Sequence, residues 1–190
     1  QSTRESLGLQ KNEKMLLQVG SGFRTKGTDR AIKMLARLPQ SLHVKLFIVG
    51  DDYAAPYQRL AKRLKVDDRV IFTGPRDDVP QLMMSADGLI HLAHSENTGT
   101  VLVEAIAAGL PVIATDVCGY ANHVTTSQCG AILKTPLSLA DAAVHVHYFL
   151  QKAHYKQAKK LGRAYVSQHD LSSMPEKVVN CLEGRDASDA

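Results

Sequence analysis

Short apolar runs alternate along the chain with segments whose apolar residues recur at helical spacing. The runs have strand length, are almost wholly apolar, and several of them end at a glycine. They predict strands at 15–19, 44–49, 69–73, 88–92 and 111–114, and they allow a sixth at 130–133. The intervening segments predict helices at 28–38, 57–64, 77–86, 100–108, 139–150, 152–168 and 176–183. Residues 1–12 and 184–190 carry neither pattern, and we expect them to be frayed.

Strands separated by helix-length segments build βαβ units, and such units form a parallel sheet with helices on both faces. The uninterrupted apolar runs agree, because a strand buried on both faces has no reason to alternate. The fold class is therefore α/β, and residues 13–150 are predicted to form a doubly wound Rossmann-like parallel sheet. Residues 151–190 continue in helical patterns and are predicted to be C-terminal helices.

Length and composition narrow the classes of protein. The 190 residues, 44% of them hydrophobic and 22% charged, suit one packed domain with a small appendage. The formal charge of +4 permits an anionic partner but does not demand nucleic acid. With four Phe, six Tyr and no Trp, stacking platforms for single-stranded nucleic acid are scarce, so no nucleic-acid partner is expected. No apolar run approaches the ~18–20 residues of a membrane span.

The start of the chain and its cysteines bear on its origin and compartment. Residues 1–5 contain neither an initiator Met nor an apolar signal core, so we expect the chain to be part of a longer polypeptide. The three cysteines, Cys118, Cys129 and Cys181, are odd in number and form no CxxC pair. They indicate a reducing, cytoplasmic setting in which each thiol acts as a small buried hydrophobe.

The loop 20–27 follows the first predicted strand, at the sheet edge where such folds bind ligands. It is not a dinucleotide fingerprint, because Thr25 stands where the third glycine is needed, and this disfavours a nicotinamide dehydrogenase. It is not a Walker loop either, since Lys26 precedes Gly27. A glycine-rich turn with Arg24 and Lys26 before a helix suits an anion, although a flexible turn with solvated charges is the alternative.

A second loop leads from the fourth strand into an apolar helix. Gly99 lets the backbone approach a ligand, and the free N–H groups of Thr100 and Val101 suit a phosphate. Glu104 lies one turn further, among Val, Leu, Ile and Ala, where a carboxylate needs a partner. Two partners are equally compatible with the spacing: a pair of sugar hydroxyls, or Arg24 or Lys26 in a buried ion pair.

Histidines and surface lysines could suggest other ligands. His145 and His147 point to different helix faces, and no carboxylate or cysteine beyond Glu96 completes a site with His91 and His94, so no metal site is expected. Further basic residues follow on a C-terminal helix, namely Lys152, Lys156, Lys159, Lys160 and Arg163. That helix could meet anionic lipid, although a solvated face is the commoner outcome.

Several motifs resemble one family in order and spacing over residues 15–133. They are Glu96-x7-Glu104, the segment EAIAAGLPVIAT at 104–115, Gly20-x5-Lys26-Gly27, GPRDDVPQL at 74–82 and SAD at 85–87. Together they resemble the donor-binding domain of the retaining, GT-B-fold glycosyltransferases of family 4. The resemblance implies the C-terminal half of a GT-B fold, with a second sheet domain preceding it.

The resemblance implies roles for individual residues. Glu96, Lys26 and Arg24 would serve the reaction: Glu96 contacts the donor sugar, Lys26 neutralises the diphosphate, and Arg24 replaces the family's Arg, because Ser21 stands at that position. The donor nucleotide would be bound by Gly20, Arg76, Gly99, Thr100, Val101 and Glu104. Of these, Glu104 would hold the ribose hydroxyls and Arg76 would lie near the uracil. Asn122 stands where the family has a Glu, so that contact is not transferred.

The resemblance also implies partners. The segments 19–27 and 114–121 are similar to those of family members that move glucose from UDP-glucose to the heptose of the lipopolysaccharide inner core. An acceptor would then be bound through an N-terminal domain, against which the helices at 151–190 would pack, and this chain alone would be inactive. No metal or cofactor is implied, and the location is cytoplasmic with peripheral contact to the bacterial inner membrane. The alternatives are a non-catalytic Rossmann-like regulatory or interaction domain and a family member with another donor and acceptor.

Overall fold

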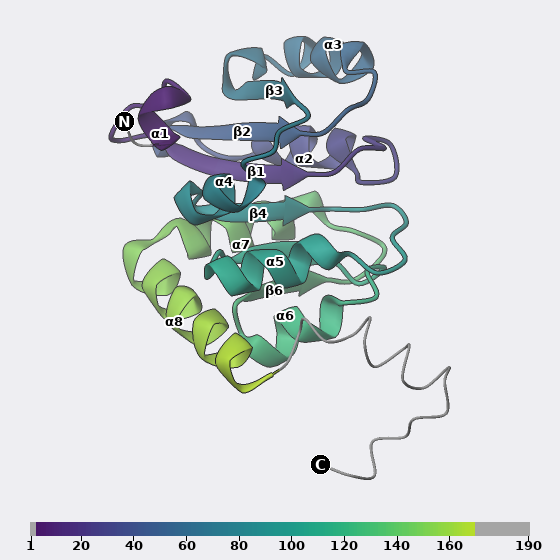
Figure 1. Ribbon diagram of the computed structural model, residues 1–190. Helices are drawn as coiled ribbons and strands as arrows, with labels where there is room; N and C mark the ends of the chain where they lie inside the picture. The colour runs from purple at the N-terminus through teal and green to yellow at the C-terminus, as the bar shows by residue number, and fades with distance from the viewer. Residues whose placement is uncertain (1–2, 170–190) are drawn as a thin grey trace.

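Residues 3–169, which the computed structural model describes, contain one six-stranded parallel sheet in the order β3-β2-β1-β4-β5-β6 (Figure 1). The strands are β1 (Lys14–Val19), β2 (Val44–Val49), β3 (Val70–Gly74), β4 (Gly88–His91), β5 (Val112–Thr115) and β6 (Gly130–Leu133). This confirms the doubly wound α/β class and all six predicted strands. The strand order reverses between β1 and β4, which places a crevice at their carboxyl ends.

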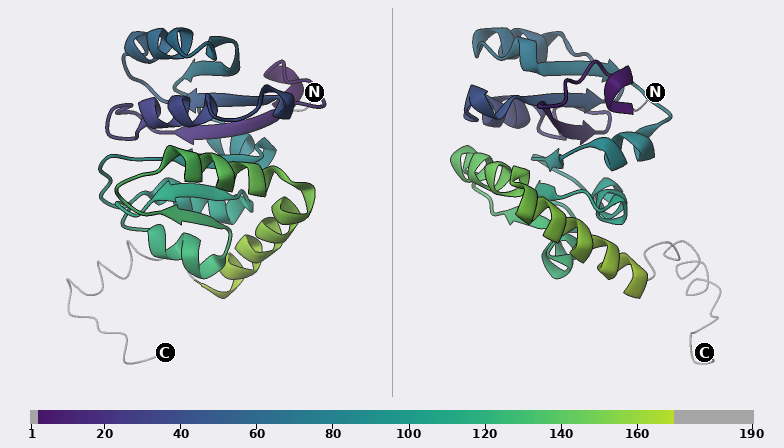
Figure 2. Two further views of the ribbon diagram at one scale, coloured as in Figure 1. Left: turned by 180° about the vertical axis from the view of Figure 1, so that it is seen from behind. Right: turned by 90° about the vertical axis from the view of Figure 1, so that its left-hand side faces the viewer.

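Helices cover both faces of the sheet (Figure 2). The α-helices are α1 (Thr3–Ser6), α2 (Thr28–Leu35), α3 (Ala55–Arg63), α4 (Val79–Ser85), α5 (Thr100–Ala108), α6 (Ala121–Ser127), α7 (Leu139–Leu150) and α8 (Lys152–Gln168). Two short 3₁₀ turns, Gln40–Leu42 and Asp67–Arg69, precede β2 and β3. Helix α2 packs with α3 and α7 on one face, while α5 packs with α4, α6 and α8 on the other.

The core forms because the central strands are buried on both of their faces. All of β4 and β5, and most of β1 and β2, are buried. Full burial of a Leu, Ile or Phe side chain contributes roughly 1.5–3 kcal/mol. The largest fully buried side chains include Phe23, Phe47, Met15, Leu16, Leu17, Ile32, Leu46 and Ile48. This packing holds rigid the strand ends from which the loops at the crevice emerge.

Two segments differ from the predictions. Residues 3–12 are not frayed: Arg4 Nη1 donates to the Ser85 carbonyl at 2.7 Å, Arg4 Nη2 donates to the Glu13 carbonyl at 2.6 Å, and Leu9 is buried. Helix α6 was not predicted, because its sequence ANHVTTS is polar and β-branched and has no apolar periodicity. The predicted helix at 176–183 and the predicted frayed end at 184–190 lie outside the described residues.

Helix α8 packs on this domain through Ala158, Gly162 and Tyr165. A Cβ at Gly162 would lie 2.6 Å from Cys129 Sγ and 3.1 Å from the Ile106 carbonyl, so the helix approaches α5 closely at this point. The contact of the C-terminal helices with a further domain stays a prediction. Within the described residues, no helix combines the length and apolarity needed to cross a membrane.

Candidate functional site

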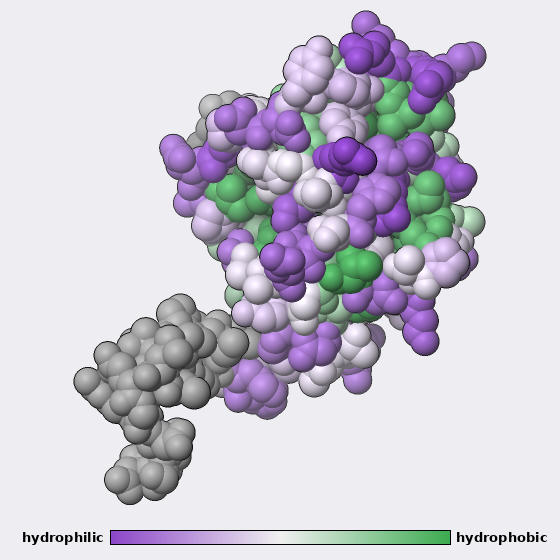
Figure 3. Space-filling view, turned by 90° about the vertical axis from the view of Figure 1, so that its right-hand side faces the viewer, coloured by the Kyte–Doolittle hydropathy of each residue, from purple (hydrophilic) through white to green (hydrophobic). Residues whose placement is uncertain are grey.

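Two loops meet at the crevice between β1 and β4. The first follows β1 and the second follows β4, and the backbone N–H of His94 joins them by donating to the Thr25 carbonyl at 2.8 Å. Gly27 makes the approach possible: it has φ of 71°, and a Cβ there would overlap the Leu92 carbonyl. Seen from the carboxyl ends of the strands, this side of the molecule is mostly hydrophilic with separate hydrophobic patches (Figure 3).

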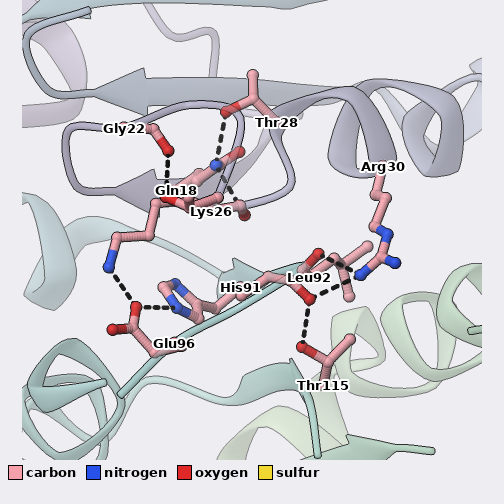
Figure 4. A network of polar contacts seen from close by, with 11 residues as sticks. Gln18, Gly22, Lys26, Thr28, Arg30, His91, Leu92, Glu96 and Thr115 are labelled. Carbon is pink, nitrogen blue, oxygen red and sulfur yellow. Dashed lines mark hydrogen bonds and ion pairs between the residues drawn. The ribbon is translucent and has the colours of Figure 1, made fainter. Parts of the chain in front are cut away.

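A lysine, a glutamate and a histidine meet at this crevice (Figure 4). Lys26 Nζ forms an ion pair with Glu96 Oε2, and His91 Nε2 lies 3.1 Å from the same oxygen. The lysine side chain is 23% exposed, the glutamate 10% and the histidine 0%. The structure therefore brings into contact two of the residues that the sequence assigned to one candidate site, and their roles there stay predictions.

The protonation states follow from burial and charge. Burial raises the pKa of Glu96, but the hydrogen bonds and charges of Lys26 and His91 outweigh it and hold the pKa below its usual value. Burial lowers the pKa of His91, and the Glu96 carboxylate opposes this only in part. At neutral pH the site therefore contains a Glu96 carboxylate and a neutral His91 imidazole.

Gly20 leaves room for the side chain of Lys26 to cross the loop. It has φ of 128°, and a Cβ there would lie 3.3 Å from Lys26 Cε, so a larger residue would crowd the aliphatic stem. Arg24 is exposed on the same loop, and within residues 3–169 its guanidinium group has no hydrogen bond or ion pair. The structure therefore brings Gly20 and Lys26 together with Glu96, and leaves Arg24 as a second cation at the rim.

The N-terminus of α5 opens beside Glu96. Gly99 precedes this helix with φ of 76° and ψ of 47°, and the N–H groups of its first turn, at Thr100 and Val101, have no acceptor in the helix. The loop after β5 supports this turn, since the Tyr120 N–H donates to the Thr98 carbonyl at 2.8 Å. The aligned dipoles and free donors make this helix end suitable for an anion.

The exposure of Glu104 differs from the prediction made from the sequence. It is exposed, because α5 turns Leu102, Ala105 and Ile106 towards the sheet and Glu104 away from it. Within the described residues its carboxylate has no ion pair, so the predicted burial and the alternative pair with Arg24 or Lys26 are both wrong. Glu104 instead borders a cavity of about 480 Å³ between α4 and α5, lined by Val79, Pro80, Met83, Met84, Ala107 and Ala108.

Arg76 is held by its own loop. Its Nε and Nη2 donate to the two carboxylate oxygens of Asp78, at 2.7 Å each, immediately before α4. Arg76 therefore does not join Lys26 and Glu96 in this structure, and a ligand near this loop would meet backbone atoms or displace Asp78.

The contact of His91 with Glu96 is not predicted by the sequence, which offers His91 only as a candidate metal ligand with His94. His94 Nε2 instead lies 2.9 Å from Asp29 Oδ1 on α2. The sequence did contain an indication of the contact between His91 and Glu96, because His91 is the last residue of a buried strand and stands five residues before Glu96. Within residues 3–169, no cluster of three or more His, Cys, Asp or Glu residues could hold a metal ion.

The parallel sheet, with an anion-suited helix end and a lysine–glutamate pair at its switch point, places the chain among the doubly wound α/β domains and gives it a candidate ligand site. Residues 1–165 match the profile of a family described as "Glycosyl transferases group 1". The chain belongs to this family and corresponds to the C-terminal half of a GT-B fold, as the resemblance predicted.

Similar proteins agree with this assignment. The chain is 40% identical over 184 residues to the lipopolysaccharide glucosyltransferase WaaG of Escherichia coli K12, with coverage of 95% of the chain and 49% of WaaG. It is 29% identical over 147 residues to an N-acetyl-alpha-D-glucosaminyl L-malate synthase of Bacillus anthracis, covering 75% of the chain and 38% of that enzyme. The chain spans about half the length, or less, of these curated relatives.

Solved structures show the same fold. The crystal structure of WaaG matches with a TM-score of 0.90 at 40% identity, over 95% of this chain and 50% of that one. The Anabaena protein HepE, solved in complex with UDP-glucose, matches with a TM-score of 0.83 at 24% identity, over 95% of this chain and 51% of that one.

Proposed function

We propose that the chain is the donor-binding half of a retaining glycosyltransferase that moves glucose from UDP-glucose to the heptose of the lipopolysaccharide inner core. The observation that carries the proposal is Lys26 paired with Glu96 beside the free N-terminus of α5. The 40% identity to WaaG over 95% of the chain supports this choice of donor and acceptor.

The reaction needs positive charge where UDP departs. Lys26 and the N–H groups of Thr100 and Val101 would bind the diphosphate and stabilise the charge that develops on it. This arrangement needs no metal or other cofactor. Arg24, exposed at the rim, would supply a second cation once the donor is bound.

The remaining residues would orient the donor. Glu96 would accept hydrogen bonds from the hexose, and Glu104 would accept them from the ribose hydroxyls at the edge of the cavity between α4 and α5. Because Arg76 is held by Asp78, we expect the uracil to be bound by the backbone of that loop, next to the arginine. Gly20 would keep the loop open for Lys26.

The acceptor and the location belong to the same proposal. The acceptor would be bound by an N-terminal domain, so this chain alone would bind the donor without transferring glucose. A cytoplasmic enzyme with peripheral membrane contact is consistent with the exposed Lys152, Lys156, Lys160 and Arg163 on α8. No nucleic-acid partner is expected.

Calorimetry of this chain with UDP-glucose, UDP-galactose, ADP-glucose and UDP tests the proposal. We expect UDP-glucose to bind most tightly, and Glu104→Gln to weaken it about tenfold through lost ribose contacts. Asp67→Asn, a change of an exposed carboxylate at the amino end of β3, is the matched control and should leave the affinity unchanged. Binding of none of these nucleotides would overturn the proposal, and tighter binding of another sugar would reassign the donor. Glucosyl transfer by this chain alone would contradict the separation of donor and acceptor sites.

A further inference from the structure

The two oxygens of the Glu96 carboxylate differ in their contacts. Both of its partners, Lys26 Nζ and His91 Nε2, approach the single oxygen Oε2. Within the described part of the chain, Oε1 receives no hydrogen bond. One oxygen is therefore fixed by the protein, while the other is left for a ligand.

The two partners differ in their freedom to move. Lys26 ends a flexible four-carbon stem that passes over Gly20, and it is partly exposed. His91 ends the buried strand β4, pairs in register with Ala114 of β5, and has no exposed side-chain surface. A ligand can therefore draw the lysine away, whereas the histidine stays in place.

The tautomer of His91 follows from its surroundings. Its Nδ1 is buried and has no partner within the described residues. A proton on Nδ1 would leave a buried N–H without an acceptor and would turn the lone pair of Nε2 towards a carboxylate oxygen. A proton on Nε2 instead donates directly to Glu96. The neutral Nε2–H tautomer is therefore the one that satisfies the geometry.

We propose that His91 is a positioning residue for the donor hexose. It holds the Glu96 carboxylate in place when Lys26 moves from that carboxylate to the diphosphate. The inference rests on the proposed function. A diphosphate carries more negative charge than one carboxylate, so it competes effectively for Lys26, and Glu96 then keeps its orientation only through His91. With Oε2 held in this way, Oε1 accepts a hydroxyl of the hexose.

Two substitutions of His91 by amide side chains, asparagine and glutamine, distinguish the positioning role from a role in packing alone. Glutamine at 91 can place its amide N–H near the position of Nε2, whereas asparagine reaches only the position of Nδ1. Calorimetry measures the dissociation constants of UDP and UDP-glucose for each protein. We expect His91→Asn to weaken UDP-glucose binding about tenfold and to change UDP binding less than twofold. His91→Gln should restore UDP-glucose binding to within about threefold of the parent.

The outcomes separate the inference from the function on which it rests. If the parent binds neither UDP nor UDP-glucose, the proposed function fails. If the parent prefers UDP-glucose and His91→Asn keeps that preference, or weakens both ligands equally, the positioning role alone is overturned. A failure of His91→Gln to restore UDP-glucose binding would also overturn it.

A second measurement needs no variant and applies even if the substitutions prevent folding. Nitrogen-15 NMR of the parent chain with labelled histidine reports which ring nitrogen carries the proton. We expect the neutral Nε2–H tautomer of His91 before and after addition of UDP-glucose. An Nδ1–H tautomer or an imidazolium in either state would overturn the assignment.

Discussion

Two lysine–glutamate pairs of similar exposure lie at opposite edges of the same sheet, one edge formed by the carboxyl ends of the strands and the other by their amino ends. Lys26 and Glu96 meet at the carboxyl ends of the strands, with side chains 23% and 10% exposed. Lys45 and Glu13 meet at the amino ends, 2.8 Å apart, with side chains 27% and 16% exposed. In both pairs, the pKa of the glutamate lies below its usual value.

The pairs differ in how their carboxylates are completed. Glu13 uses both oxygens within the protein, since Oε1 meets Lys45 and Oε2 accepts the Gln10 N–H at 2.8 Å. Glu96 receives two partners on one oxygen and stands beside a free helix end. In a complete pair, such as Lys45 and Glu13, both carboxylate oxygens have partners in the protein, and the pair links one strand to the next. In an incomplete pair, such as Lys26 and Glu96, one carboxylate oxygen has no partner within the described residues. Because Glu96 also lies beside free N–H groups of α5, this pair can exchange its partners for a ligand.

The largest effect should come from the glycine that brings the two loops of the crevice together. Gly27→Ala would strain a left-handed backbone and overlap the Leu92 carbonyl, so we expect the free energy of unfolding to fall by at least about 3 kcal/mol. The control is Gly8→Ala near the amino edge, with φ of 68° and no atom within 4 Å of its Cβ, which should lose only about 1–2 kcal/mol. Equal losses in urea denaturation would contradict the close packing at the crevice.

Substitution of the two lysines tests the comparison directly. Lys26→Met should weaken UDP-glucose binding by about 10- to 30-fold, because the diphosphate loses its nearest cation while the aliphatic stem is preserved. Lys45→Met removes the same charge at the opposite edge and should change that affinity less than twofold. Calorimetry at one salt concentration measures both. Equal effects would mean that the net charge of the chain, and not the site, attracts the donor.

The pH dependence of the free energy of unfolding should report on the buried His91 at the crevice. Burial lowers the pKa of His91, so the unfolded chain binds a proton more readily than the folded protein does. This contribution to stability is complete above the unfolded pKa near 6.5 and is lost as the pH falls towards the lower, folded pKa.

Chemical denaturation between pH 7.5 and 5 measures the loss, which for one proton is at most about 1.4 kcal/mol per pH unit. His91→Gln should flatten this part of the profile. Burial also lowers the pKa of His123, so a smaller slope should persist in the variant. A profile unchanged by His91→Gln would contradict the buried neutral imidazole.

The sequence was sufficient to predict the sheet and the strand ends at which the candidate site lies. Apolar runs such as 44–49 are recognisable without any knowledge of their neighbours, because a strand buried on both faces has a continuous pattern. Lys26 and Glu96 were found for a similar reason, since both lie just after strands and the carboxyl ends of adjacent parallel strands share one edge.

The errors have a common physical cause, which is that contacts between distant segments leave no local pattern. Glu104 was expected to be buried because its neighbours are apolar, but only one side of α5 faces the sheet. Residues 3–12 were expected to fray, yet Arg4 is tied to Ser85, 81 positions away. The contact of His91 with Glu96 depends equally on how the loop after β4 folds back.

The smallest expected effect concerns the complete pair. Glu13→Gln removes the charge opposite Lys45 and should lower the free energy of unfolding by only about 0.5–1 kcal/mol at pH 7. The hydrogen bond with Lys45 is the main cause of the lowered pKa of Glu13, so this stability is present above the unfolded value of 4.5 and is lost as the pH falls through the folded value. The difference between parent and variant should therefore shrink in acid, while UDP-glucose binding at pH 7 should be unaffected. If Glu13→Gln weakened donor binding as Lys26→Met is expected to, the two edges would be coupled, and the distinction between a structural pair and an exchangeable one would fail.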